Sequence, residues 1–386
     1  MSRVAIKEIV LRWAIDRAGL TIDTLEQKYP NINKWATGES QPTLKQLEGF
    51  AKTTHTPLGF FFLPFPPDER LPIPHFRTSD NDIQERPSPA LLETVHAMQL
   101  RQAWMRDFLI EQGQESLLFV KSATPDTKPT IVANRIRQAL NLDEGWANKE
   151  KNWADALGAM RKAMESAGIL VTVNGIVGNN THWKLDPGEF RGFVLVDDYA
   201  PLVFVNGSDG KAAQMFTLAH ELAHVFFGSS AAFDLREMQP ANDPIERACN
   251  QVAAEFLIPE HVMRSVWPSV KDNSDPYQVI ARQFKVSSIV AARRALDLGL
   301  IHRKDFFDFY QKYLADERRT ASRNKEKKGK GDFYLNQNLR VGKRFGSAVA
   351  RAALEGRLLY SEAYHLTGLH GKTFDRYMTS LEIGGA

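Results

Sequence analysis

The stretch TLAHELAHVFFG, residues 217–228, contains two histidines four positions apart, and a glutamate directly follows the first of them. In a helix, positions i and i+4 lie on one face, one turn apart, so His220 and His224 can direct their imidazole nitrogens at a common point. Glu221 lies about 100° further round the helix axis, where its carboxylate can reach a water at that point without binding the metal. The stretch therefore predicts two metal ligands and a general base.

A catalytic zinc ion usually has three protein ligands and a fourth position for water, so the pattern requires a third ligand elsewhere. The helix-forming run 243–259 offers two carboxylates, Glu246 and Glu255. They are nine residues apart and face nearly opposite sides of a helix, which allows only one of them to reach the metal. We predict that Glu246 is the ligand, because it shares a helix face with Asn250 and Ala253, whose small side chains allow another helix to approach. Glu255 is expected at the surface or beside a ligand.

These residues predict zinc-dependent hydrolysis of a peptide bond. Zn2+ held by two neutral imidazoles and one carboxylate lowers the pKa of its bound water and polarises the scissile carbonyl. Glu221 takes the proton of the water and passes it to the leaving amine. A hydrogen-bond donor to the oxyanion is also expected, and Tyr199, His182 and Tyr277 are open candidates for it.

The alternative interpretation of the motif is an apolar helix with two incidental histidines. The helix is apolar almost all round, and burying two histidines and a glutamate there costs free energy unless they are paired or bind a metal. Its apolar residues are Phe216, Leu218, Leu222, Val225 and Phe226. This surrounding favours the metal site over the incidental pattern.

Two strand-like segments, 192–197 and 201–206, precede the motif and predict an antiparallel hairpin. If one of them lies at the edge of the sheet, it can pair with an extended peptide and hold its carbonyl near the metal. Ser208 or Asp209 is expected to cap the motif helix.

Helical patterns dominate the rest of the chain, from Ser88 to a terminating Gly168 and again after residue 229. We therefore predict a mostly helical α+β fold with a zincin-like core. In this core a small antiparallel sheet packs against the motif helix, and helical modules flank the core at both ends.

Changes of composition divide the chain into five segments. The first is a helical, helix-turn-helix-like domain in which Thr21 and Thr43 are expected N-caps, and a proline-rich linker follows it. A basic, glycine-containing run is predicted to be a second linker. The predicted segments are the helical domain 1–63, the linker 64–87, the metallopeptidase domain 88–316 with a helical subdomain after residue 260, the basic linker 317–332 and the C-terminal helical module 333–386.

Composition narrows the class of protein. The 49 Lys and Arg residues against 46 Asp and Glu leave a formal charge of +3, which gives no overall argument for nucleic acid or membrane binding. The only cysteine is Cys249, which excludes an internal disulfide and fits a reducing compartment. No apolar run is long enough to cross a membrane. We expect a cytoplasmic protein with no membrane partner.

The chain resembles the ImmA/IrrE family of bacterial metallo-endopeptidases over roughly residues 8–302. Four blocks carry the resemblance in the family's order, and the best defined are FTLAHELAHVFFG and IERACNQVAAEFLIP. The family's zinc histidines match His220 and His224, its catalytic glutamate matches Glu221, and its glutamate ligand matches Glu246. The resemblance also implies an N-terminal domain of the Cro/repressor helix-turn-helix type.

The resemblance implies a Zn2+-dependent endopeptidase that cleaves a Cro/repressor-like transcription factor and so regulates stress or mobile-element genes. DNA is an open partner, because only residues 30–33 separate TLEQKY from KWATGE and the expected recognition helix is truncated. The alternative function is a DNA-binding or partner-binding transcriptional regulator whose zinc site is structural or sensory and which cleaves nothing.

Overall fold

The structure is a computed structural model that describes residues 3–72, 75–76, 87–233, 243–324 and 336–381. Its described residues form two compact units, the first from 3–72 with 87–96 and the second from 75–76 with the described part of 97–381. Among the helices that the structure describes, none is long and apolar enough to span a membrane.

Short helices build the first unit. They are α1 (Glu8–Arg17), α2 (Ile22–Glu26), α3 (Ile32–Ala36), α4 (Leu44–Thr53) and the 3-10 helix η1 (Leu58–Phe62). The predicted caps are confirmed, since Thr21 accepts a hydrogen bond from the Thr24 backbone and Thr43 from the Gln46 backbone. The core is aromatic, and Phe50 packs edge-on against Tyr29, Trp35 and Phe61.

The third helix of this unit is as short as the sequence indicates. α3 has five residues, of which Ile32, Trp35 and Ala36 are buried in the core of the unit. Few polar side chains of α3 therefore remain for contact with bases in a DNA groove. The assignment of this unit to the Cro/repressor helix-turn-helix type stays a prediction.

A five-stranded mixed sheet lies in the second unit, in the order β1-β5-β3-β4-β2. The strands are β1 (His75–Phe76), β2 (Leu170–Asn174), β3 (Gly192–Leu195), β4 (Leu202–Asn206) and β5 (Ala231–Phe233). β3 and β4 form the predicted antiparallel hairpin, with Val194 opposite Val203. β2 pairs in parallel with β4 along its whole length, from Leu170 opposite Leu202 onward.

The expectation of a purely antiparallel sheet is therefore wrong. A parallel partner requires a long connection, and the segment between β2 and β4 provides it while also forming β3. Periodicity reveals the hairpin, whose strands are neighbours in the sequence, but it carries no information on the more distant pairing. Both β3 and β4 lie inside the sheet, so the condition under which a hairpin strand could pair with a peptide is not met.

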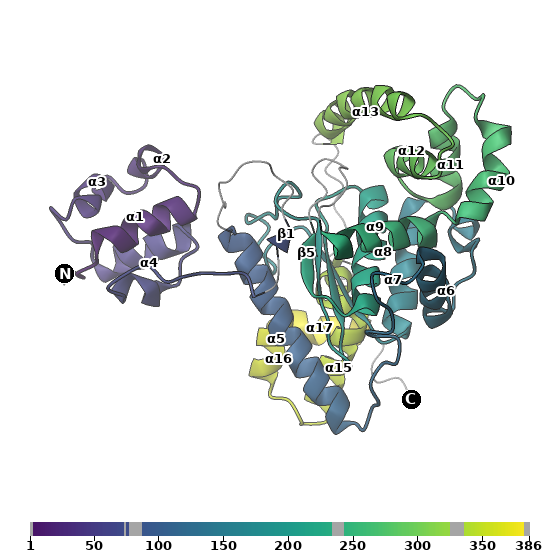
Figure 1. Cartoon of the computed structure of the whole chain (residues 1–386). Coiled ribbons are helices and arrows are strands. Elements are labelled where there is room, and N and C mark those ends of the chain that lie inside the picture. Colours follow the sequence, from purple (N-terminus) through teal and green to yellow (C-terminus); the bar gives the residue numbers. More distant parts are fainter. Residues whose placement is uncertain (1–2, 73–74, 77–86, 234–242, 325–335, 382–386) are drawn as a thin grey trace. The chain divides into compact units, whose positions relative to one another are not determined.

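The helix of the HExxH motif, α8 (Lys211–Phe227), is the centre of the second unit. It packs against β3 and β4 and against three helices, which are α6 (Pro129–Leu140), α7 (Trp153–Ser166) and α9 (Pro244–Leu257). Figure 1 shows α6, α7, α8 and α9 grouped beside the sheet. α7 ends as expected, since Gly168 follows it with a φ of 106°.

The N-cap of α8 differs from the prediction. It is Gly210, and no side chain caps the helix there. Ser208 donates its hydroxyl to the Gly175 carbonyl instead, and Asp209 accepts the Gly210 N–H outside the helix. The expected caps are thus used in the preceding loop.

Four helices follow the motif region: α10 (Glu260–Val270), α11 (Pro276–Phe284), α12 (Ser288–Asp297) and α13 (Arg303–Asn324). α13 covers residues 317–324, where a linker was predicted, because this part is rich in Glu, Arg and Ala and its first glycine comes only at Gly329. Residues 325–332 of that predicted linker lie outside the described residues.

The C-terminal helices are part of the second unit. They are the π-helical turn η3 (Asn338–Gly342), α15 (Lys343–Leu354), α16 (Tyr360–Thr367) and α17 (Lys372–Ser380). Figure 1 shows α15 to α17, in yellow, beside α5 (Pro89–Glu111). The buried Arg101 of α5 donates to the carbonyls of Leu366 and Arg340, and Trp104 packs on Phe345. These contacts hold the C-terminal helices against α5.

Candidate metal centre

Two adjacent helices bring the predicted site residues together. His220 and His224 lie one turn apart on α8, and their side chains are fully buried. Asp243 caps α9 by accepting the N–H groups of Ile245 and Glu246, so Glu246 lies in the first turn of its helix, 4% exposed. α8 and α9 pack side by side, and the glutamate faces the two histidines.

The three side chains converge at hydrogen-bond distance. His220 Nε2 lies 3.1 Å from one carboxylate oxygen of Glu246, and His224 Nε2 lies 3.1 Å from the other. The two Nε2 atoms are themselves 3.1 Å apart. Three donors bonded to a tetrahedral zinc at about 2.0 Å are about 3.3 Å from one another. The spacing in this cluster therefore fits a metal ion bound by all three residues.

The protonation of the histidines supports the same fit. His220 Nδ1 lies 3.1 Å from the amide oxygen of Asn250, an acceptor, which places the proton on Nδ1 and leaves Nε2 as a lone pair. Burial lowers the pKa of His220 despite the opposing effect of Glu246, so the imidazole is neutral. The Nε2 lone pair of His220 and the carboxylate of Glu246 repel each other unless a cation lies between them. Asn250 is thus an orienting residue that the sequence reasoning treated only as a small neighbour.

Glu246 keeps its negative charge in this surrounding. Burial acts to raise the pKa of its carboxyl group, but hydrogen-bond donation and positive charge from the side of His220 and His224 outweigh burial and lower the pKa below its usual range. When the imidazoles are neutral, a cation bound between the three groups supplies that positive charge. An ionised carboxylate is the form that binds a metal ion.

Cys249 is the one further candidate ligand near this cluster in the described part of the chain. Its thiol lies within 4.8 Å of the ligand nitrogens of His220 and His224, whereas the Glu246 oxygens lie at 3.1 Å. A zinc ion shared by a thiolate and an imidazole holds the two donor atoms about 3.5 Å apart. Burial, with the charges of Glu246 and Glu221, raises the pKa of the Cys249 thiol well above its usual value. Distance and protonation both favour Glu246 as the ligand.

Glu221 lies beside this cluster and under the sheet. It is fully buried, and neither carboxylate oxygen has a hydrogen-bond partner among the residues that the structure describes. Burial and the charge of Glu246 raise the pKa of Glu221 well above its usual value. A buried carboxyl group without a partner is costly, and such groups concentrate at functional sites.

A glycine in β3 makes room for this carboxylate. A Cβ atom at Gly192 would lie 2.6 Å from Thr217 Cγ2, 2.8 Å from the Phe204 carbonyl oxygen and 3.2 Å from Glu221 Oε1. Any larger residue would therefore push the strand away from α8. The absence of a side chain at Gly192 allows the sheet to lie directly over Glu221.

The remaining sequence candidates lie elsewhere. Glu255 is buried, not at the surface, and its carboxylate pairs with Arg294 and accepts the N–H of Glu260. Tyr277 stacks on Trp267, and no contact joins it to the histidines in the described residues. The roles proposed for Tyr199 and His182 as oxyanion donors also stay predictions.

The comparison with known families covers the same part of the chain. Residues 166–296 match the peptidase family model described as the IrrE N-terminal-like domain. The site lies in a peptidase-like domain. The match includes α8 and α9, and we call residues 166–296 the peptidase domain. This match supports a metallopeptidase-type function for residues 166–296 and relates them to the ImmA/IrrE proteins. The N-terminal unit lies outside the matched residues.

The C-terminal helices match a second family model. Residues 341–380 correspond to a domain of unknown function, DUF8813. No curated protein matches the chain.

Proposed function

We propose that the chain is a zinc-dependent endopeptidase that cleaves a specific protein, a Cro/repressor-like transcription factor. The observation that carries the proposal is the convergence of the Nε2 atoms of His220 and His224 and the Glu246 carboxylate at 3.1 Å from one another. Glu221, next to His220 in the sequence, has no hydrogen-bond partner in the described part of the chain. The match of the peptidase domain supports the reaction class. The repressor as substrate rests on the resemblance to the ImmA/IrrE family.

The residues of the chain divide the chemistry between them. Zinc bound by His220, His224 and Glu246 would polarise the scissile carbonyl and acidify water at the site. Asn250 holds the His220 ring so that Nε2 faces the metal position. Glu221 accepts the proton of the attacking water and delivers it to the nitrogen of the leaving amine as the C–N bond breaks. The surrounding apolar core excludes other water from these groups.

The sheet topology restricts how a peptide can reach this site. Neither strand of the hairpin has a free edge, because β4 is paired with β2 and β3 with β5. On the side of β3, the outer position beside β5 is taken by β1, the chain's own residues His75 and Phe76. A substrate strand that pairs beside β5 therefore has to replace β1.

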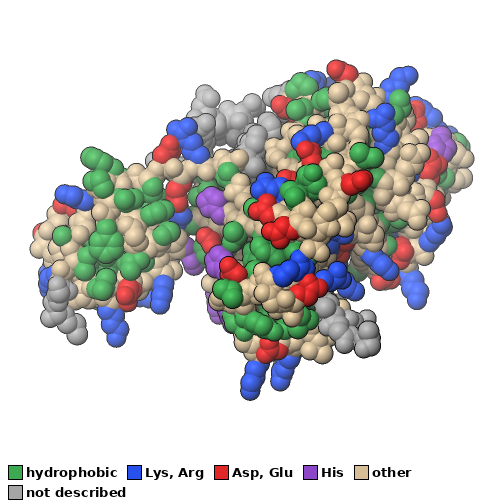
Figure 2. Space-filling model, turned by 90° about the horizontal axis from the view of Figure 1, so that it is seen from below, with side chains coloured by type: hydrophobic (Ala, Val, Ile, Leu, Met, Phe, Trp, Pro, Cys, Tyr) green, Lys and Arg blue, Asp and Glu red, His purple; other side chains and the backbone are tan. Residues whose placement is uncertain are grey.

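A DNA- or partner-binding regulator with a structural zinc site fits these observations less well. A structural zinc site closes its fourth position with a protein ligand, and it has no need of a buried glutamate like Glu221. On the face that Figure 2 shows, basic and acidic side chains are interspersed rather than collected into one basic surface. Such a mixed surface gives no field that would attract a nucleic acid backbone.

The substitution Glu221→Gln tests the function. It keeps the size of the side chain and all three ligands, so bound zinc should stay at the wild-type level while cleavage of a co-encoded repressor falls by about a hundredfold or more. Zinc is measured by elemental analysis and cleavage by mass spectrometry of the repressor fragments. Undiminished cleavage by the variant would rule out the proposed mechanism, and specific salt-dependent DNA binding without cleavage would favour the regulator.

A further inference from the structure

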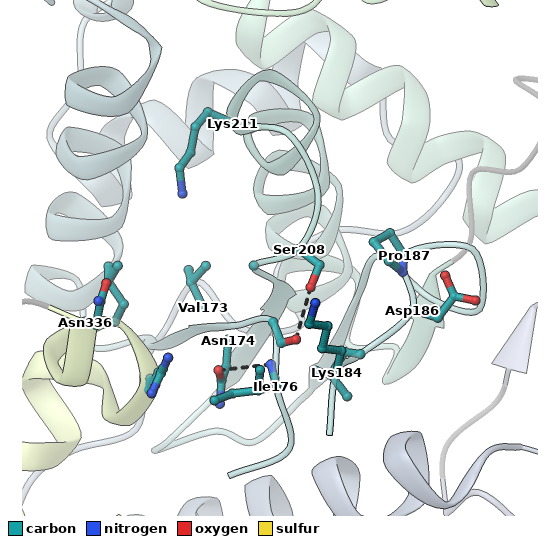
Figure 3. A pocket seen from close by; sticks show the side chains of 14 residues that line it. Val173, Asn174, Ile176, Lys184, Asp186, Pro187, Ser208, Lys211 and Asn336 are labelled. Carbon is teal, nitrogen blue, oxygen red and sulfur yellow. Dashed lines mark hydrogen bonds between the residues drawn. The ribbon is translucent and has the colours of Figure 1, made fainter. Parts of the chain in front are cut away.

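A cavity lies at the start of α8, away from the candidate metal centre. It has a volume of about 650 Å³ and lies where β2 and β4 end, and it is closed on one side by residues just before and within η3. Figure 3 shows the side chain of Lys211 directed into the cavity, opposite Val173 and Asn336. His220 is nine residues further along the helix, about 14 Å away at 1.5 Å per residue. The cavity is thus separate from the ligand cluster.

Three basic side chains from three parts of the chain line this cavity. They are Lys184, Lys211 and Arg340, and the lining contains one carboxylate, Asp186. Asp186 accepts the Gly188 N–H. Within the described ranges, no ion pair joins any of the three basic groups to a carboxylate. Among the described residues, the lining of the cavity therefore carries more positive than negative charge.

Arg340 is half-buried, and Lys211, although its side chain is exposed, has enough protein around it to lose some of its hydration. Burial lowers the pKa of Arg340, and burial together with the charge of Arg161 lowers the pKa of Lys211. Cations that lose hydration and gain no counter-ion are unfavourable, and an anion between them would restore the lost interaction. Lys211 makes one long contact, of 3.5 Å, to the Gln214 side chain, which carries no charge.

The backbone of α8 adds to the positive potential. Gly210 is its N-cap and no side chain accepts the N–H groups of the first turn, which begins at Lys211 in the cavity wall. The N-terminus of a long helix carries a partial positive charge and unpaired N–H donors. The apolar side chains Ile176, Leu185 and Leu339 line other parts of the wall. The cavity wall thus has a positively charged part that suits an anion and apolar parts that suit an uncharged group.

We propose that this cavity binds a phosphorylated small molecule, with its phosphate between Lys211 and Arg340 and its uncharged part against Ile176 and Leu339. The volume lies within the range of small-molecule sites. A phosphate accepts several charge-assisted hydrogen bonds at once, which suits a cavity lined by three cations better than a single carboxylate does. Because Arg340 comes from the C-terminal segment and Lys211 begins the helix of the metal ligands, the bound molecule would connect these two elements.

Isothermal titration calorimetry on the full-length protein tests the proposal without reference to peptidase activity. The probes are inorganic phosphate, pyrophosphate and adenosine 5′-monophosphate, with adenosine as the unphosphorylated control, in chloride buffer of fixed ionic strength. We expect saturable binding of at least one phosphorylated probe and none of adenosine. Lys211→Gln and Arg340→Gln should each weaken that binding by about 10- to 100-fold, the loss of one charge-assisted hydrogen bond. Lys304→Gln, on the exposed surface of α13, should leave it unchanged.

Three results would overturn the proposal. The first is the absence of binding tighter than about 1 mM for all three probes. The second is binding that survives Lys211→Gln and Arg340→Gln but is lost in Glu246→Ala, which would place the phosphate at the metal centre. The third is tighter binding of a hexaglutamate peptide than of any phosphorylated probe, which would make the cavity a docking site for an acidic segment. Each result leaves the metal content and the cleavage assay to decide the proposed function independently.

Discussion

Helix α9 carries two buried glutamates that differ in what neutralises them. Glu246 and Glu255 are 4% and 6% exposed and lie on opposite sides of the same helix. Glu255 pairs with Arg294, whose guanidinium also donates to the carbonyl of Ile258. Glu246 faces two imidazoles, and that of His220 directs an Nε2 lone pair, not a positive charge, at the carboxylate. The protein thus supplies a counter-ion for one carboxylate and not for the other.

The difference separates a structural group from a functional one. In a buried ion pair whose atoms are all hydrogen-bonded, both charges are balanced without any ligand, and the pair serves to hold helices together. A buried carboxylate beside a neutral imidazole has its charge balanced when a cation binds between the two groups. On this reasoning we propose that Glu246 belongs to a metal centre, while the Glu255–Arg294 pair belongs to the framework of residues 166–296.

The largest expected effect is the loss of metal on removing Glu246. Glu246→Ala should reduce zinc from about one ion per chain to a small fraction, because two imidazoles alone hold zinc weakly. Glu255→Ala should keep the full zinc content in the folded fraction, and elemental analysis after gel filtration measures both. Equal zinc in the two variants would end the distinction between the two glutamates.

The next effect concerns stability and should be specific to Glu255. Glu255→Gln leaves the Arg294 charge buried without its partner, which should lower the free energy of unfolding by about 3–5 kcal/mol in urea titrations. Glu260→Gln is the matched control, since its pair with Arg264 is about half exposed and should contribute under about 1 kcal/mol. A loss of similar size in both variants would show that the buried pair has no special role.

The residue that orients His220 should have a smaller effect than the ligands. Asn250→Ala removes the acceptor of the Nδ1 proton, so zinc affinity should fall by about 10- to 100-fold while the site still fills at high zinc. Competition with a chromophoric chelator measures the affinity. Zinc affinity unchanged from wild type would mean that the helix alone fixes the ring.

The smallest expected effect is on stability, from a substitution at Gly192, where β3 lies over Glu221. Gly192→Ala places a methyl group against Thr217 and the Phe204 carbonyl and should lower the free energy of unfolding by about 1–3 kcal/mol. Gly158→Ala, in α7 with no atom within 4 Å of the added Cβ, should be neutral or stabilise by up to about 1 kcal/mol. Thermal unfolding of both variants compares them directly. If the two substitutions have equal effects, β3 does not lie tightly over α8.

Features that depend on residues close together in the sequence were predicted, and contacts between residues far apart in the sequence were missed. The spacing of His220 and His224 and the helical run around Glu246 depend on neighbours within a few turns, so periodicity places them on helices. The parallel pairing of β2 with β4, the partner of Glu255 and the hydrogen bond of Asn250 depend on residues far apart in the chain. Composition also suggested Ser208 or Asp209 as the cap of α8, but both side chains bond within the preceding loop.

X-ray absorption at the zinc edge of the metal-loaded wild-type protein tests the central claim most directly. The account predicts one zinc per chain with only nitrogen and oxygen neighbours at about 2.0 Å, two of them imidazole nitrogens, as expected for His220, His224 and Glu246. A sulfur neighbour at about 2.3 Å would make Cys249 a ligand and contradict the assignment of Glu246.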